Sequence, residues 1–180
     1  MRLSASIVCS IALLCPALRA QQPSASTNPV SQGIRDTWEG AKRNLTESAG
    51  QMLEADYNFK PTDSVRTFGQ ILAHVAGASY VFCSAARGEK TPHEEDDFEK
   101  TATTKAQIVK VLNESIAYCD AAYTALTDRT AAEVVPMAFG GKPAARASAL
   151  IGNVGHYQEH YGNLVTYFRI KGLVPPSSRR

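Results

Sequence analysis

The chain has 180 residues, of which 44% are hydrophobic, and its 19 basic and 17 acidic side chains give a formal net charge of +2 at pH 7. A chain of this length can form one domain with its own hydrophobic core. The near-neutral charge argues against the basic surface that nucleic-acid binding requires, so we expect no nucleic-acid partner.

Residues 1–20 have the layout of a cleaved secretory signal. Arg2 precedes an apolar run over residues 7–14, and Ala20 comes directly before the polar stretch QQPSASTNP. The apolar run is too short to span a bilayer, and Cys15 lacks the small residue before it that lipid attachment needs. We therefore expect cleavage near Ala20, export to the periplasm or the medium, and no membrane anchor afterwards. Residues 21–31 are rich in Ser, Gln, Pro and Asn, and we expect them to form a flexible leader.

Four helical patterns follow, and no segment shows the alternation of a strand. The first helix has one apolar stripe, made of Ile34, Trp38, Ala41, Leu45, Met52 and Leu53. The second helix is predicted to begin at Thr62 or Asp63, which are good N-caps, and to end near Gly88. Residues 89–102 are rich in charge and predict an exposed connection.

The third helix begins after Thr104, which stands three residues before Gln107 in a capping-box spacing. Its apolar face consists of Ile108, Leu112, Ile116, Cys119, Tyr123 and Leu126. The fourth helix is predicted to begin at Pro143, to run to Lys171 and to stop at Gly172. Four helices of this kind predict an all-α four-helix bundle over residues 32–178, with no second domain.

The stretch HYQEH contains the first candidate metal ligands. His156 and His160 are four residues apart, so on a helix both imidazoles can point at one ion, although two structural or solvent-facing histidines have the same spacing. The order HxxEH also matches the inverted zinc-protease motif, which requires an acidic ligand further downstream. No Asp or Glu follows Glu159, so the protease interpretation fails.

A third ligand has to come from upstream, and His74 is the best candidate. Its helical neighbours Ile71, Ala78 and Val81 are expected to face the core. A histidine there needs partners for its ring nitrogens, and a backbone carbonyl or a tyrosine hydroxyl would serve as well as a metal. His93 lies in the charged connection and is expected to be exposed.

Other residues near these histidines suggest a shaped site. Four glycines interrupt the second and fourth helices and predict either close helix packing or a ligand cavity: Gly77, Gly152, Gly155 and Gly162. Asn153, Asn163 and Tyr167 share the face of His156 and His160 and are candidates for orienting the imidazoles. No residue is assigned as general base.

Cys83 and Cys119 are the two cysteines that remain after the predicted signal. In an oxidising compartment they can form a disulfide, and they can equally be two buried thiols that pack as small apolar residues. The sequence leaves both alternatives open.

The segments RTFGQILAHVAGASYVFCSAARGE and HYQEHYGNLVTYFRIKGLVPPSS resemble the DinB/YfiT-like superfamily, especially its exported members, and the resemblance extends over residues 34–178. It implies a four-helix bundle with a long crossover between the second and third helices. It also implies a divalent metal, zinc or nickel, held by three histidines at the positions of His74, His156 and His160. A long crossover lets those two helices run parallel, so a bridge between Cys83 and Cys119 would support this topology.

Three neutral imidazoles would leave a zinc-like ion an open position for water or substrate. Relatives in this superfamily include thiol-dependent transferases and an isomerase. We therefore expect a metal-dependent hydrolase or thiol transferase that acts on a small molecule, and export disfavours thiol transfer because such thiols are mainly cytosolic. The alternatives are a non-catalytic metal or small-ligand binder, and an interaction bundle whose histidines are incidental. A homodimer is compatible with either.

Overall fold

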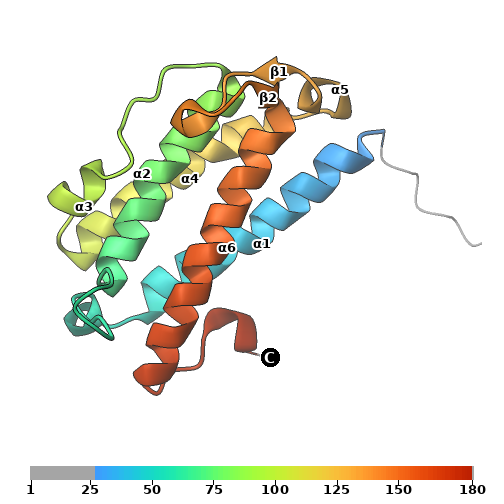
Figure 1. Cartoon of the computed structure of the whole chain (residues 1–180). Helices are drawn as coiled ribbons and strands as arrows, with labels where there is room; N and C mark the ends of the chain where they lie inside the picture. Colours follow the sequence, from blue (N-terminus) through green and yellow to red (C-terminus); the bar gives the residue numbers. More distant parts are fainter. Residues whose placement is uncertain (1–26, 180) are drawn as a thin grey trace, which may run out of the picture.

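Four long helices form most of the structure, a computed structural model that describes residues 27–179. They are α1 (Pro29–Gln51), α2 (Phe68–Arg87), α4 (Lys105–Ala125) and α6 (Arg146–Ile170). Both α1 and α2 pack against α4 and against α6, as Figure 1 shows. The expected all-α fold is confirmed. The predicted signal, residues 1–20, lies outside the described residues.

Short elements connect the long helices. They are the helices α3 (Asp97–Thr101) and α5 (Asp128–Ala131), the 3₁₀ turns η1 (Glu54–Asp56), η2 (Ala138–Gly140) and η3 (Pro176–Ser178), and the strands β1 (Val134–Val135) and β2 (Ala144–Ala145). The two strands pair antiparallel, with Val134 opposite Ala145. They lie at one end of the bundle, where the chain turns into α6 (Figure 1).

The helix α1 begins inside the segment that we expected to be a flexible leader. Pro29 occupies its first turn, where a missing N–H costs nothing. The Asp128 carboxylate accepts hydrogen bonds from the N–H groups of Val30 (3.2 Å) and Ser31 (2.8 Å). A distant carboxylate therefore caps the helix, which local sequence could not reveal. At the other end, Leu53 lies beyond the helix and is exposed, contrary to its place in the predicted stripe.

The helix α2 begins at Phe68, later than the predicted start at Thr62 or Asp63. Thr67 and Gln70 form a reciprocal capping box. The N–H of Phe68 donates to the carbonyl of Phe59 (2.9 Å), so the chain before the helix folds back on itself and residues 60–66 form a loop. The predicted end is confirmed, because Gly88 follows the helix with a φ of 71°.

The Cys83–Cys119 disulfide joins α2 to α4, with Cα atoms 5.4 Å apart. Cys83 is the sixteenth residue of α2 and Cys119 the fifteenth of α4, so the two cysteines lie at similar heights in two helices that run parallel. Figure 1 shows the long connection that returns from the end of α2 to the start of α4. The disulfide resolves the alternative that the sequence left open, and it supports the predicted crossover.

The crossover is only in part the exposed connection that its charge predicted. It contains α3, whose Phe98 is buried. At Gly77 of α2, an added Cβ atom would lie 2.0 Å from the carbonyl oxygen of Glu95 and 3.0 Å from that of Glu94. Only glycine permits this approach, so the crossover backbone lies directly on α2.

The core is built around Trp38 of α1. Its ring stacks on Tyr123 at 4.5 Å between centroids and meets Tyr157 edge-on at 4.9 Å. Its indole N–H donates to Asp120 (2.6 Å) at the edge of the core. These contacts join α1, α4 and α6, so α6 is held at the depth where it carries its histidines.

The helix α6 begins at Arg146 instead of Pro143. Ala144 and Ala145 are extended because they pair with β1, and the Arg146 N–H donates to the Glu133 carbonyl (2.7 Å). The predicted end is confirmed, with Lys171 as C-cap and Gly172 at a φ of 71°.

The helix α2 is long and apolar enough to cross a membrane by composition, but 78% of that window is buried within the bundle. Such burial is typical of the central helix of a globular core.

Candidate metal centre

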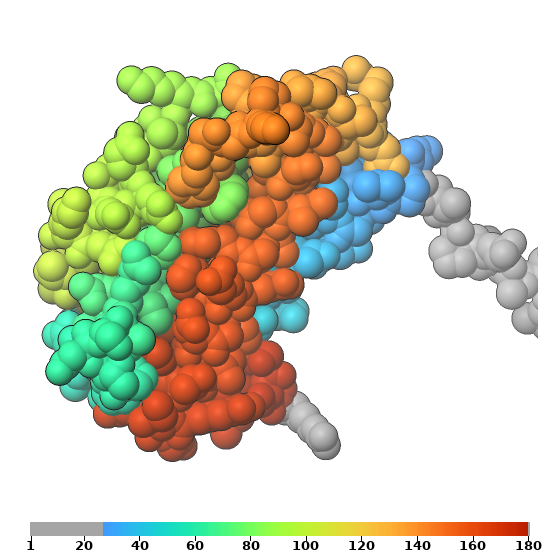
Figure 2. Space-filling view, viewed as in Figure 1, coloured from blue at the N-terminus to red at the C-terminus, as the bar shows by residue number. Residues whose placement is uncertain are grey.

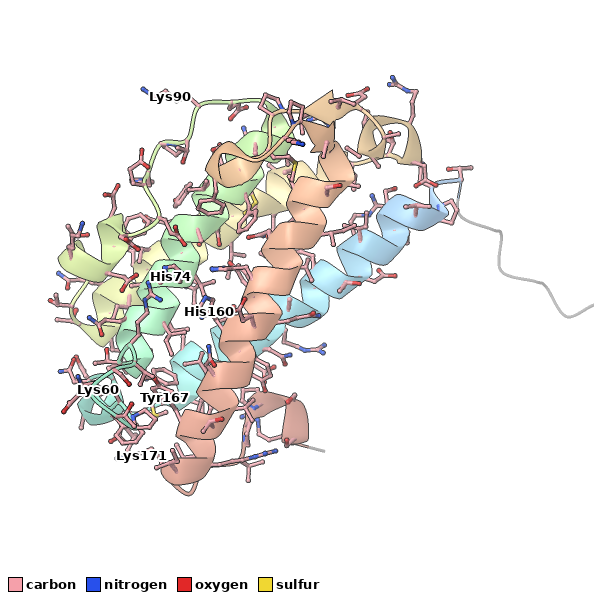
Figure 3. The ribbon with its side chains drawn as sticks, in the orientation of Figure 1. Lys60, His74, Lys90, His160, Tyr167 and Lys171 are labelled. Atoms are coloured by element: carbon pink, nitrogen blue, oxygen red, sulfur yellow. A yellow bond between two sulfur atoms is a disulfide. The ribbon has the colours of Figure 1, made fainter. Side chains whose placement is uncertain are left out.

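The three predicted histidines lie together between α2 and α6. His74 comes from α2, and His156 and His160 lie one turn apart on α6. The Nε2 atom of His156 is 3.2 Å from that of His74 and 3.1 Å from that of His160. Figure 3 shows His74 and His160 on facing helices, and their ring centroids are 4.9 Å apart. His93 lies elsewhere, half-buried against the rings of Tyr80 and Phe98.

The spacing of the Nε2 atoms fits one metal ion. A tetrahedral ion with metal–nitrogen bonds of about 2.05 Å separates two ligand nitrogens by about 3.3 Å. The observed separations of 3.1 and 3.2 Å are close to this value. Each Nε2 atom of a neutral ring carries either a proton or a lone pair, so hydrogen bonds among the three atoms cannot satisfy all of them.

The surroundings of His156 and His160 favour neutral rings. Burial is the largest cause, and it acts with the charges of His160, His74 and Arg66 to lower the pKa of His156 to about 3. Burial and the charges of His74 and Arg66 lower the pKa of His160 to about 4, although Glu159 opposes this shift. Neutral imidazoles keep their Nε2 lone pairs available at neutral pH, as metal ligation requires.

The outer nitrogens of the rings lack hydrogen-bond partners. The Nδ1 atoms of His74, His156 and His160 are buried and accept or donate no hydrogen bond in the structure. The candidates proposed to orient the rings do not do so. Asn153 donates to the hydroxyl of Tyr123 (3.1 Å), and the Tyr167 hydroxyl donates to the carbonyl of Arg66 (2.5 Å). Asn163 lines a neighbouring cleft.

Three crossover carboxylates surround His74, and sequence reasoning missed them. Glu95 Oε1 lies 3.4 Å from His74 Nε2, on the side of the metal cluster. Asp96 Oδ1 and Glu99 Oε1 lie 3.6 and 3.1 Å from Nδ1, on the opposite side of the ring. The Glu99 contact has the distance of a hydrogen bond but not its angle. Arg66 Nε donates to both oxygens of Glu99, at 3.1 and 3.0 Å.

The acidic run EEDDFE was the available signal for these carboxylates. It covers residues 94–99, and its charge alone suggested solvent exposure. Only the close approach of Glu95 to Gly77 places the run beside His74. Without the crossover path, the sequence does not distinguish a charged surface loop from a segment that covers a site.

A cleft of about 470 Å³ opens beside His160. One wall is the loop before α2, which contributes Arg66 together with Pro61, Thr62, Ser64 and Val65, and the other is the C-terminal half of α6. Figure 2 shows this loop (teal) lying against α6 (red-orange). The volume lies within the range of small-molecule sites, and the cleft reaches a predicted metal ligand.

An aromatic contact lies on another side of the histidines. The Phe82 ring is 5.7 Å from the His156 ring and meets Phe139 edge-on at 5.1 Å. Phe139 has a φ of 56°, a left-handed conformation that a bulky residue seldom adopts. Gly152 makes room for Phe82, because an added Cβ would lie 3.0 Å from the ring.

The four glycines singled out in the sequence divide into two pairs. Gly77 and Gly152 allow close contacts, as predicted. Gly155 and Gly162 lie on the exposed face of α6 with no neighbouring atom within 4 Å of an added Cβ, so neither prediction holds for them.

Comparisons with known proteins agree with this architecture. The sequence profile of the DinB superfamily matches residues 37–164. A DinB-like protein from Bacillus cereus superimposes with a TM-score of 0.67 at 16% identity, covering 81% of this chain and 95% of that one. A DinB-like protein from Bacillus subtilis gives 0.62 at 18% identity, covering 82% and 99%. No curated protein matches the sequence significantly.

A mycothiol-dependent maleylpyruvate isomerase has a similar fold. It superimposes with a TM-score of 0.60 at 14% identity, covering 74% of this chain. The match spans 60% of the isomerase chain, so the isomerase contains a large part without counterpart in the match. At this identity the likeness concerns the fold alone.

Proposed function

This chain belongs to the DinB superfamily, and from that premise we propose that it is a metal-dependent enzyme whose divalent ion is held by His74, His156 and His160. The convergence of three largely buried Nε2 atoms supports the proposal above all. Zinc and nickel are the proposed metals, because imidazole suits both. When bound, such an ion supplies a Lewis acid and lowers the pKa of a coordinated water.

The remaining residues of the site would bind and position a small molecule. The cleft beside His160 gives it access, and Arg66 offers a guanidinium near the histidines. Burial of His74 and His160, which are 5% and 8% exposed, excludes water from the inner side of the site. We propose hydrolysis or thiol transfer as the reaction class, with the general base unassigned.

We also propose that the protein is exported to the periplasm or the medium. The Cys83–Cys119 disulfide supports this location, because disulfides persist mainly in oxidising compartments. The similar isomerase uses mycothiol. Low-molecular-weight thiols of this kind belong mainly to the cytosol, so export favours the hydrolase class over thiol transfer.

A non-catalytic metal binder is the second candidate, and Glu95 is the observation that favours it. A carboxylate 3.4 Å from His74 Nε2 could complete a four-ligand structural site. The cleft at His160 favours catalysis instead, since a purely structural site needs no path for a substrate.

Metal analysis of the untagged protein tests the proposal. We expect about one zinc or nickel ion per chain, lost in His156→Ala and retained in His93→Ala, a histidine substitution away from the cluster. Retention of the ion in His156→Ala would contradict the three-histidine site. Absence of bound metal in the unsubstituted protein, even after incubation with both ions, would exclude the metalloenzyme and leave an interaction bundle.

A further inference from the structure

We infer that Glu95 is a fourth, displaceable ligand of the metal, which the crossover delivers to the resting protein and which an incoming substrate replaces. The inference rests on the proposed three-histidine site. As a ligand of the metal, Glu95 gives the crossover a role. The three-histidine site alone gives it none.

The position of the Glu95 carboxylate beside His74 is the first observation that supports a ligand role. Glu95 Oε1 is 3.4 Å from His74 Nε2, close to the separation of about 3.3 Å for two ligands of a tetrahedral ion. The neighbouring acids face the other side of the same ring, because Asp96 and Glu99 approach Nδ1. Among the carboxylates of the described chain that contact His74, Glu95 is thus the one beside its metal-facing nitrogen.

The backbone of the crossover fixes this position. Gly77 follows His74 by three residues, so it lies one helical turn away on the same side of α2. A Cβ at Gly77 would lie 2.7 Å from the carbonyl carbon of Glu95, in addition to its clash with the oxygen. The Asp97 side chain accepts a hydrogen bond from the Glu94 N–H (2.9 Å), which stabilises the bend before α3. The backbone of the crossover therefore places residue 95 beside His74.

The side chain itself is free to move. It is 36% exposed, and its described contact is with His74 alone, whereas Arg66 pairs with Glu99 and lies 3.9 Å from Asp96. The carboxylate does not belong to the group of ligand atoms that the three histidines form within 4.8 Å of one another. The side chain therefore has to rotate toward the histidines to bind the same ion. No Lys or Arg side chain of the described residues forms a salt bridge with Glu95 in the structure.

The positive charge of the metal ion favours binding of the carboxylate. Three neutral imidazoles leave the full double charge of the ion in a site with little water, and a carboxylate ligand halves it. An anionic substrate entering by the cleft can supply the same neutralisation. Exchange of one such ligand for the other opens the position where a substrate atom binds.

Zinc affinity and the absorption spectrum of the cobalt(II)-loaded protein test the inference. We expect Glu95→Gln to bind one ion per chain, with zinc affinity at least about tenfold weaker in competition with a chelator and with a changed cobalt spectrum. Azide, as a probe of an open position, should perturb the cobalt spectrum of Glu95→Gln at lower concentration than that of the unsubstituted protein.

Glu94→Gln is the matched control, because it makes the same change one residue away at an exposed side chain. It should retain the affinity, the spectrum and the azide response of the unsubstituted protein. Equal affinities and spectra for the Glu95 and Glu94 variants would overturn the role of Glu95 while leaving the three-histidine site intact. An unsubstituted protein that binds neither zinc nor cobalt would instead overturn the proposed metal site and this inference with it.

Discussion

At the scale of single residues, His156 and His160 couple the stability of the metal-free protein to pH. Their pKa values fall to about 3 and about 4 in the folded chain, and an unfolded histidine has a pKa near 6.5. Between pH 6.5 and 4 the unfolded chain therefore binds more protons than the folded chain, and the free energy of unfolding decreases as the pH falls. Each extra proton bound by the unfolded chain lowers the free energy of unfolding by at most about 1.4 kcal/mol per pH unit.

Urea unfolding of the metal-free protein from pH 7.5 to 4.5 measures this effect. Carboxylates contribute to the same slope, so the comparison is with His156→Gln, whose side chain is polar but does not titrate. We expect the variant to lose less stability than the unsubstituted protein over this range. Equal slopes would show that His156 takes up its proton as readily in the folded chain as in the unfolded one.

Gly77 predicts a second effect at this scale. An alanine there must displace the crossover backbone at Glu95, and such overpacking costs about 1–3 kcal/mol. Gly155→Ala is the control, since its added Cβ meets nothing within 4 Å and replaces a helical glycine, a gain of up to about 1 kcal/mol. Urea midpoints should move in opposite directions. A stabilised Gly77→Ala protein would show that the crossover shifts without cost.

The sequence was sufficient to select the three histidines but not their surroundings. The i, i+4 spacing put His156 and His160 on one face, and the apolar neighbours of His74 pointed it inward. Glu95 could not be predicted, because its approach to His74 depends on the path by which the crossover folds back onto α2. Asn153 was predicted to orient an imidazole but lies deeper and donates to Tyr123, because sharing a helical face does not fix depth in the core.

At the scale of elements, the disulfide holds α2 and α4 in parallel register. Cys83 and Cys119 are 36 residues apart, and closing a loop of that length in the unfolded chain gives a stabilisation of about 4 kcal/mol in the chain-entropy estimate. We expect the Cys83→Ala/Cys119→Ala protein to lose about this much free energy of unfolding in urea. Reducing agent should destabilise the unsubstituted protein and leave the double variant unchanged. Equal stability of the two proteins would contradict a structural role.

Helix boundaries were predictable where the cap is local. Thr104 and Gln107 form the predicted capping box at the start of α4. The start of α2 was placed at Thr62 or Asp63, because those residues resemble caps as well as Thr67 does. The N–H of Phe68 instead finds the carbonyl of Phe59, a contact set by how the loop folds back. The cap of α1 by Asp128 comes from a residue about 100 positions away.

At the scale of the whole molecule, the candidate site joins four separate parts of the chain. The histidines come from α2 and α6, the carboxylates come from the crossover, and the loop before α2 forms a cleft wall. The disulfide lies on the other side of α2 and fixes it against α4. A metal ion would thus connect α6 and the crossover to a pair of helices that is already covalently linked.

This arrangement predicts that metal binding stabilises the entire bundle, because the unfolded chain separates His74 from His156 by 82 residues and cannot form the same site. At a free metal concentration 100 times the Kd, binding to the folded state alone adds about 2.7 kcal/mol. For a chain of this size that corresponds to a rise in Tm of about 5–11 °C. Thermal unfolding with and without zinc should show the rise in the unsubstituted protein and in His93→Ala, but not in His74→Ala. A similar rise in His74→Ala would place the stabilising ion elsewhere. A rise confined to proteins with all three histidines would link α2 and α6 through the metal.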